Sequence, residues 1–325
     1  MDIESLEIFS TLRTSNNPVI QYKTRVELLE ENSKEREILE LQKKIKECDM
    51  AKKLLSGVKK NGTIDANPYK KWQGPLWTLV SLAHINYPLG DISLNPMRDQ
   101  VYNWLLEDKH IKFPRSKLIP GQEDRFRRCA GQEAYTVWFT LKLGIADDRT
   151  DILVDRLKQW QWPDGGWNCD KREDARKSSL IETFIPVLAL SYYGRLKNDK
   201  SAIESALHAS EVILKRKIFR SQSTGEIIHR DFILLSYPNF YNYNILTMLS
   251  ILKEAGLLSD NRCSEALEIL RKKQQKNGGF PLERRITNLS SELKTRGSYV
   301  DWGNVGKRKT NQFVTIEALK ILKDY

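Results

Sequence analysis

Three carboxyl groups of this 325-residue chain are candidates for proton-transfer chemistry. Glu133 and Glu182 each lie about three helical turns before a glycine that is expected to end an apolar helix. Both should therefore lie near helix starts, where they could face one cavity, and Asp301 is the third candidate. A carboxyl group in an apolar cavity has a raised pKa and can act as a general acid. The structural alternative is a favourable charge at a helix N-terminus or an ion pair with one of three nearby bases: Arg128, Arg176 or Lys177.

Two groups of residues are of the types that bind metal ions. In Asp147-Asp148-Arg149-Thr150-Asp151, the carboxylates lie about one helical turn apart, which suits magnesium, but the segment also suits a helix N-cap. Cys169, Asp170 and His229 could offer a thiolate, a carboxylate and an imidazole to zinc and leave a fourth position open. Otherwise Cys169 is a packed thiol at a turn. The sequence supports neither metal, and we expect no cofactor.

Positive charge is concentrated immediately before the apolar helices. The residues concerned are Lys71, Arg127, Arg128, Arg176, Lys177, Arg230, Arg308 and Lys309. If these helices start at one end of the molecule, they form a basic rim toward which the positive helix dipole ends also point. Such a rim suits an anionic group such as a diphosphate, and the alternative is a solvated basic surface. The 53 basic and 42 acidic residues are compatible with an anionic partner but say nothing of the fold.

A turn with glutamine, two glycines and an aromatic residue recurs along the chain and divides it into helical pairs. It occurs near residues 159–169 and 274–280, with a degenerate copy near 59–64. Apolar helices are predicted at 18–31, 74–86, 130–144, 177–194, 239–256 and 310–324. Amphipathic, charged helices are predicted at 3–13, 33–57, 94–108, 150–162, 200–218 and 261–276.

Six apolar helices and six amphipathic ones indicate an all-α (α/α)6 toroid, because only an inner ring is covered on all sides. We predict a single toroid domain over residues 1–325, in which the first helical pair, at about residues 1–40, is the least clear. An open superhelical solenoid is the competing architecture. The apolar last helix argues against it, because a solenoid needs polar capping repeats.

Aromatic residues are predicted to line a cavity inside this ring. They are Trp72, Trp77, Trp138, Tyr241, Tyr243 and Trp302. Aromatic faces stabilise cations, which carbocation chemistry requires. The alternative for each of them is ordinary packing in the core.

The recurring turns carry a family resemblance. Gln159-Trp160…Gly165-Gly166-Trp167 and Gln274-Gln275…Gly278-Gly279-Phe280 resemble the QW-type repeats of the terpenoid cyclase and protein prenyltransferase superfamily. The chain is most similar to small bacterial squalene-cyclase-like proteins labelled prenyltransferase/squalene oxidase-repeat. The resemblance implies the toroid and isoprenoid chemistry. The chain departs from the family because it has no DXDD acid motif and no zinc triad in register.

Three functions follow as hypotheses. The first is binding of an isoprenoid or lipid-like ligand, with or without a phosphate head, in an aromatic cavity, with acid-initiated cyclisation or prenyl-diphosphate chemistry. The second is a non-catalytic module whose basic rim binds a nucleotide, nucleic acid or another anionic partner. The third is a carbohydrate-active toroid, which needs two carboxylates about 5–10 Å apart.

Location is indicated by what the sequence lacks. Its longest apolar run, near residues 184–190, is far shorter than the roughly 20 residues that span a bilayer. The start of the chain has no signal-peptide pattern, and the four cysteines form no CxxC pair. We therefore expect a reduced, cytoplasmic protein that is not transmembrane.

Overall fold

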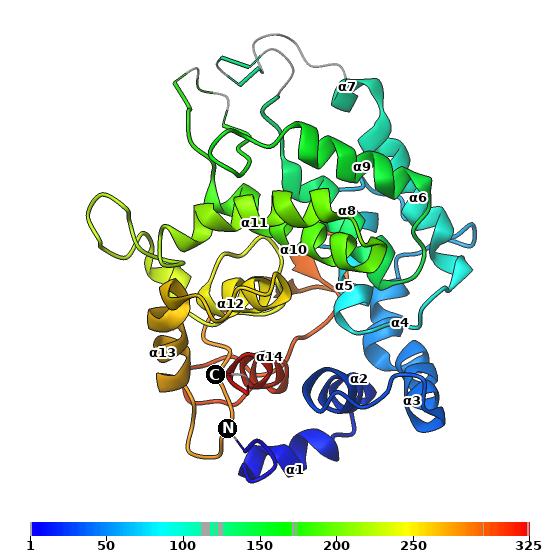
Figure 1. The fold of residues 1–325 in the computed structure, drawn as a ribbon. Helices are drawn as coiled ribbons and strands as arrows, with labels where there is room; N and C mark the ends of the chain where they lie inside the picture. The colour runs from blue at the N-terminus through cyan, green and yellow to red at the C-terminus, as the bar shows by residue number, and fades with distance from the viewer. Residues whose placement is uncertain are drawn as a thin grey trace.

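Two kinds of helix alternate along the chain (Figure 1). The computed structural model describes residues 2–111, 118–119, 121–122, 126–170, 172, 174–294, 296–323 and 325. The more buried helices are α2 (Pro18–Tyr22) with its π-helical continuation η1 (Lys23–Leu28), α5 (Pro75–His84), α8 (Ala130–Lys142), α10 (Leu180–Lys197), α12 (Ile245–Glu254) and α14 (Gln312–Leu322). The flanking helices are α1 (Glu7–Arg13), α3 (Arg36–Glu47), α4 (Asp49–Leu55), α6 (Asn95–Leu106), α9 (Asp148–Gln159), α11 (Lys200–Leu214) and α13 (Ser264–Lys272). The short elements are α7 (Asp108–Ile111), η2 (Ile92–Leu94), η4 (Arg230–Ile233), η5 (Asn261–Cys263), β1 (Asn288–Leu289) and β2 (Gly297–Ser298).

The buried helices form the inner ring of an α/α toroid. Helix α5 packs on α8, α8 on α10, α10 on α12, α12 on α14, and α14 on η1. The ring closes at Glu27 of η1, which accepts hydrogen bonds from Lys320 of α14 at 2.8 Å and from Asn86, just after α5, at 2.7 Å. Figure 1 accordingly shows α14 beside α2 and its continuation. The predicted all-α toroid is confirmed, and this closure excludes the open solenoid.

The three predicted turns share one backbone pattern. In each turn, the amide of the first residue donates to the carbonyl of the residue four positions later. The amide of the residue three positions later donates back to the carbonyl of the first residue, and all these hydrogen bonds are 2.8–2.9 Å long. The first residues are Lys59, Trp162 and Gln275. The fourth residue is always a glycine with positive φ, between +78° and +106°, which other residues rarely adopt. The turns are therefore structurally equivalent, as their sequences suggested.

Several helix boundaries differ from the prediction, and two of the differences have a clear structural cause. The predicted helix 33–57 is two helices, because Cys48 has an extended backbone with ψ of 158° between α3 and α4. Helix α12 begins at Ile245 rather than near residue 239, because the side chain of Asn244 caps it by accepting the amide of Thr247 at 3.2 Å. No helix in the described part of the chain is long and apolar enough to cross a membrane.

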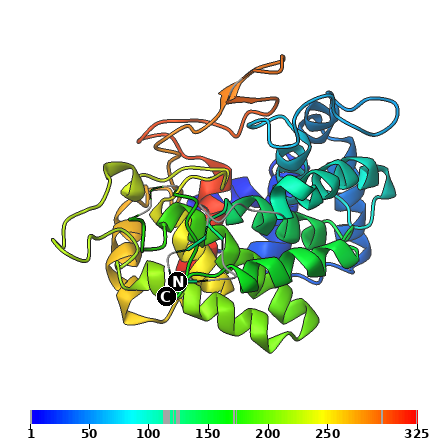
Figure 2. The same cartoon turned by 90° about the horizontal axis from the view of Figure 1, so that it is seen from above.

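A long connection covers one end of the ring. Figure 2 shows the segment between α13 and α14, which carries the parallel strands β1 and β2, projecting from the helices. The side chain of Gln73, just before α5, donates to the carbonyl of Glu292 at 2.7 Å. The connection therefore lies over the end at which α5 begins, which is the end where a basic rim was predicted.

Candidate functional site

Glu133 holds two arginines inside the protein. It is fully buried near the start of α8, and its Oε1 forms ion pairs with Arg156 at 2.8 Å and with Arg128. The Arg128 guanidinium also lies 4.1 Å from the ring centroid of Trp160. A carboxylate that bridges two guanidinium groups is a structural element. The ion-pair interpretation therefore describes Glu133, and the proton-donor interpretation has no support.

The other two candidate acids lie in opposite environments. Asp301 is exposed, with 59% of its side chain accessible, and accepts the amide of Gly303 at 3.1 Å. Glu182, at the start of α10, is nearly buried, and the Cys169 thiol donates to its Oε1 at 3.5 Å. Burial and then the neighbouring Cys169 raise the pKa of Glu182 to about 8. Glu182 therefore has the protonated carboxyl group that a general acid needs at neutral pH.

The predicted basic rim is not a ring of solvated side chains. Arg127 is buried and donates to the backbone carbonyl of Asp170 at 3.3 Å, and Arg128 is buried against Glu133. Lys71 is half-buried, with its Nζ 5.2 Å from the ring centroid of Trp72. Five members of the predicted rim are exposed: Arg176, Lys177, Arg230, Arg308 and Lys309. The rim prediction is therefore wrong for the two arginines, which are used in folding.

Most of the predicted cavity aromatics pack against one another. Trp72 and Trp77 meet edge to face at 4.4 Å, and Trp77 lies 5.9 Å from Tyr241, both measured between ring centroids. Trp302 packs in the same region, 6.2 Å from Phe240, and Tyr243 packs on Phe184 at 5.8 Å. These rings fill the end of the toroid where the inner helices begin. Of the six, only Trp138 lines the central cavity.

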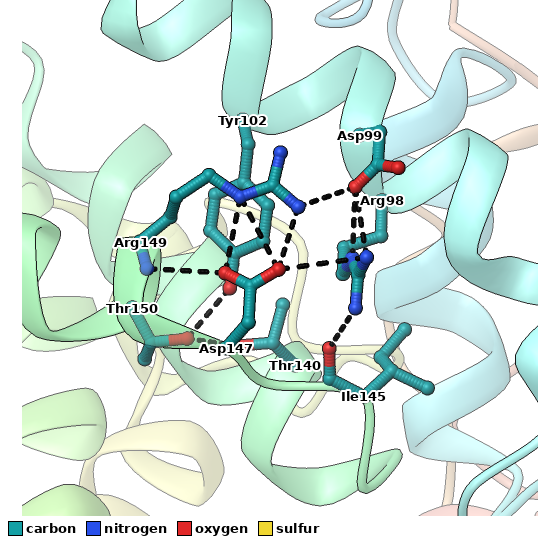
Figure 3. Close-up of polar contacts among 8 residues, drawn as sticks. All are labelled: Arg98, Asp99, Tyr102, Thr140, Ile145, Asp147, Arg149 and Thr150. Carbon is teal, nitrogen blue, oxygen red and sulfur yellow. Dashed lines mark hydrogen bonds and ion pairs between the residues drawn. The ribbon is translucent and has the colours of Figure 1, made fainter.

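The acidic run at residues 147–151 is a helix cap. Figure 3 shows Asp147 between Arg149 and Arg98. Its Oδ1 accepts the amide of Arg149 at 3.0 Å, and its Oδ2 pairs with Arg149 at 2.6 Å and with Arg98 at 3.5 Å. Asp151 accepts the hydroxyl of Tyr193 at 2.9 Å. The capping interpretation is confirmed, and with these partners in place the magnesium interpretation has no support.

The predicted zinc trio is not assembled in the structure. Asp170 pairs with the neighbouring arginine at 2.6 Å, and His229 is exposed, with its Nδ1 accepting a backbone amide at 3.1 Å. Instead, the ligand atoms of Cys129, Cys169 and Glu182 lie within 4.8 Å of one another. This is the one such group found among the described residues. Cys169 was thus predicted with the wrong partners.

A cavity of about 310 Å³ lies at the centre of the ring. All six inner helices contribute to its wall, mainly through their C-terminal halves, so it is at the opposite end from Glu182. Its polar lining consists of Lys23, Glu27, His84, Lys142, Tyr192, Ser236, Tyr237, Asn239, Thr247, Ser250, Glu254, Glu317 and Lys320. The cavity meets solvent beside Lys320 and Glu254, whose side chains are 23% and 31% exposed.

Four charged groups of the wall form a closed ring. Lys23 pairs with Glu27 at 2.9 Å and with Glu317 at 3.1 Å, and Lys320 pairs with the same carboxylates at 2.8 and 3.3 Å. Burial alone would raise the pKa of Glu27, but the ammonium groups, Lys23 foremost, outweigh it and hold that pKa well below its usual range. Burial likewise opposes the lowered pKa of Glu317, which Lys320 and Lys23 produce. Both carboxylates are therefore ionised at neutral pH.

Other polar groups of the wall have no partner among the described residues. Lys142 forms no ion pair or hydrogen bond with them, and burial lowers its pKa. The Nε2 of His84, the hydroxyl of Tyr237 and the Oδ1 of Asn239 are buried without a hydrogen-bond partner there. Burial, then the charge of Lys23, lowers the pKa of His84 to about 3, so its imidazole is neutral. The cavity thus presents one ammonium group that forms no ion pair with the described residues, beside three neutral groups without hydrogen bonds to them.

The sequence carried a signal for this cavity that the search for motifs missed. Charged residues interrupt helices that are otherwise apolar, and they do so near the C-terminal end: Glu27, Lys142, Glu254, Glu317 and Lys320. Buried charges are rare unless they are paired or functional. Their recurrence at one level of the inner helices would have indicated a polar centre.

Comparisons with known proteins identify neither a family nor an activity for the chain. No model of a protein family matches the chain, and no curated protein matches it. Among solved structures, it is similar to a family 76 glycoside hydrolase from a bovine Bacteroides thetaiotaomicron strain, with a TM-score of 0.38 and 12% identity. The similar region covers 77% of this chain and 55% of that enzyme, so the chain spans about half its length. Of the predicted family resemblance, only the helical toroid is present in the structure, and terpenoid cyclase membership is not shown.

Proposed function

We propose that the protein binds a small, polar, anionic molecule in the central cavity. The observation that carries this proposal is Lys142, a desolvated ammonium group with no ion pair among the described residues, in a wall whose other charges are matched. Lys23 and Lys320 are neutralised by Glu27 and Glu317, and the carboxylate of Glu254 pairs with an arginine outside the wall. A carboxylate or phosphate on the ligand supplies the missing counter-charge.

Neutral groups of the wall define the rest of the ligand. Leaving a buried donor or acceptor unsatisfied costs about 1–3 kcal/mol, so these groups favour a molecule that completes their hydrogen bonds. The amide oxygen of Asn239 accepts a hydrogen bond, while the hydroxyl of Tyr237 and neutral His84 can take either role. The ligand therefore carries hydroxyl or amino groups beside its anion. Hydroxy acids, amino acids and sugar acids share this chemistry.

Size limits the ligand as well. A cavity of about 150 Å³ accommodates one benzene ring. The cavity here is about 310 Å³, which by that scale holds roughly a dozen non-hydrogen atoms. A squalene-sized chain needs more than twice this room. Gluconate, citrate and glutamate fall within it.

The enzymatic hypotheses draw less support from the geometry. Acid-initiated cyclisation of an isoprenoid is supported by the raised pKa of Glu182, but that carboxyl group does not line the central cavity in which the substrate would lie. Glycoside hydrolysis needs one protonated carboxyl, whereas Glu27 and Glu317 are held ionised. The hypothesis that a basic rim binds an anionic partner loses support because Arg127 and Arg128 are buried.

The test is a thermal-shift and calorimetric comparison of small acids with neutral molecules. D-gluconate, citrate and L-glutamate are the acids, D-glucose is the neutral sugar control and farnesol is the isoprenoid. We expect at least one acid to raise Tm and to lose at least tenfold in affinity in Lys142→Met. Lys197→Met, on the exposed end of α10, is the matched control and should bind as the unchanged protein does. Stabilisation by farnesol or glucose with none by the acids would refute the proposal.

A further inference from the structure

The end of the toroid opposite the central cavity holds a second group of chemically reactive side chains. We infer that Cys129, Cys169 and Glu182 bind a zinc ion. Their two sulfurs and a carboxylate oxygen lie within 4.8 Å of one another. Ligands held tetrahedrally at zinc distances are about 3.8 Å apart, so the three atoms need to move by less than about 1 Å. None of the three lines the central cavity, and the inference is independent of the function proposed for it.

The scaffold brings these residues together from three segments. Cys129 immediately precedes α8, Glu182 lies in the first turn of α10, and α8 and α10 are adjacent in the inner ring. Cys169 follows the repeated turn, whose Trp167 is fully buried and donates its Nε1 to a carbonyl of α9 at 3.0 Å. The carbonyl of Trp167 accepts the amide of Ser179 at 2.9 Å, which ties this turn to the start of α10. The ligands are therefore held in place without a metal ion.

One polar atom of this group of three side chains lacks a hydrogen bond to the described residues. Cys169 Sγ donates to Glu182 Oε1 at 3.5 Å, but the other oxygen, Oε2, is buried and has no hydrogen-bond partner among the described residues. Two thiols and a carboxyl group are unfavourable in partly buried positions, because each is an acidic group that forms only weak hydrogen bonds with the other two. A divalent cation that displaces their protons satisfies all three at once.

Charge balance at the site also fits a divalent ion. Two thiolates and one carboxylate carry three negative charges, of which a Zn²⁺ ion neutralises two. Lys71 supplies the third positive charge, since its ammonium group interacts electrostatically with both Cys129 and Glu182. It is held there by the rings of Tyr69, Trp72 and Tyr241, whose centroids lie 5.2–5.6 Å from its Nζ. Lys71 is thus a positioning residue for the metal site.

The ligand types select zinc among the common ions. Thiolates favour soft or borderline cations and exclude magnesium and calcium, which require oxygen ligands. Three protein ligands leave a fourth tetrahedral position for water or an added anion. The competing chemistry is a disulfide between Cys129 and Cys169, which would need an oxidant and would destroy the site.

The experiment uses the full chain, reduced, stripped with EDTA, and then loaded with zinc or cobalt(II). Elemental analysis after desalting should find about one zinc per chain, and cobalt(II) should give the intense near-ultraviolet absorption of a thiolate complex. Cys129→Ser and Cys169→Ser should abolish retention. Lys71→Met should weaken zinc binding about 10- to 100-fold, as loss of an outer partner does. Cys48→Ser, at the junction of α3 and α4, is the matched control and should retain zinc.

Three results would overturn the inference. They are loss of all zinc from the reduced protein on desalting, equal retention by the double variant Cys129→Ser/Cys169→Ser, and a cobalt spectrum without thiolate absorption. A measurement that needs no cysteine variant is made in the unchanged protein, where zinc should protect two of the four thiols from a thiol reagent. Loss of two thiols that a reductant restores, with no zinc bound before or after, would assign the pair to a disulfide instead.

Discussion

Replacing Glu27 by glutamine should destabilise the protein strongly. Glu27 pairs with Lys23 at 2.9 Å and Lys320 at 2.8 Å and accepts Asn86 at 2.7 Å, with 14% of its side chain exposed. Removing one partner of a buried ion pair leaves an uncompensated charge and costs about 3–5 kcal/mol. Glu317 still contacts both lysines, so we expect the lower end of that range. The loss should appear as a lower urea midpoint with an unchanged denaturant slope.

The matched control is Glu40→Gln on the surface of α3. Glu40 also pairs with a lysine at 2.8 Å, but 54% of its side chain is exposed, and such solvated pairs contribute little to stability. Added salt should weaken the Glu40 pair more than the Glu27 pair, because buried charges are screened less. If the two variants lose equal stability, the charged ring does not close the toroid and the reasoning fails.

Three further outcomes are expected. The pKa of His84 is about 3 in the folded protein, against 6.5 in the unfolded chain, so between these values the unfolded chain binds one more proton. Stability should therefore fall by up to about 1.4 kcal/mol per pH unit as the pH is lowered from 6.5. In urea titrations at successive pH values, His84→Gln should remove that component, and an unchanged profile would contradict the assignment. Tyr237→Phe should raise the free energy of unfolding by up to about 1–3 kcal/mol, since it removes a buried hydroxyl that has no hydrogen-bond partner among the described residues, yet should weaken binding of the anion severalfold by calorimetry. Gly131→Ala should cost about 1–3 kcal/mol by overpacking, because its Cβ would lie 2.0 Å from the Tyr241 hydroxyl oxygen; unchanged thermal stability would mean that the ring moves aside freely.

The helical ring could be predicted because its signals are local. Apolar periodicity, glycine stops and the repeated turn each depend on a few neighbouring residues, and the turns at 59–64, 159–169 and 274–280 do share one hydrogen-bond pattern. The site depends on distant pairs. Cys129 and Cys169 meet only because α8 and α10 are neighbours. Motif spacing within one segment therefore paired Cys169 with the adjacent Asp170.

Charge could not be assigned to a surface from sequence position alone. Arg127 and Arg128 stand in a basic run that resembles an exposed rim, yet both are buried because carbonyl groups and Glu133 accept their hydrogen bonds. For the same reason, the polar lining of the central cavity could not be predicted. Whether a lysine such as Lys142 faces solvent or the centre depends on the rotation of its helix, which the neighbouring helices determine.

Closure of the ring through Glu27 and Lys320 has a consequence for synthesis of the chain. The two residues are separated by 293 positions, so the face of η1 that contacts α14 stays open while almost the whole chain is being made. Contacts between such distant segments form slowly, and exposed apolar surface promotes association in the meantime. A nascent chain lacking α14 would be an open arc, which is the form that a molecular chaperone would be expected to hold.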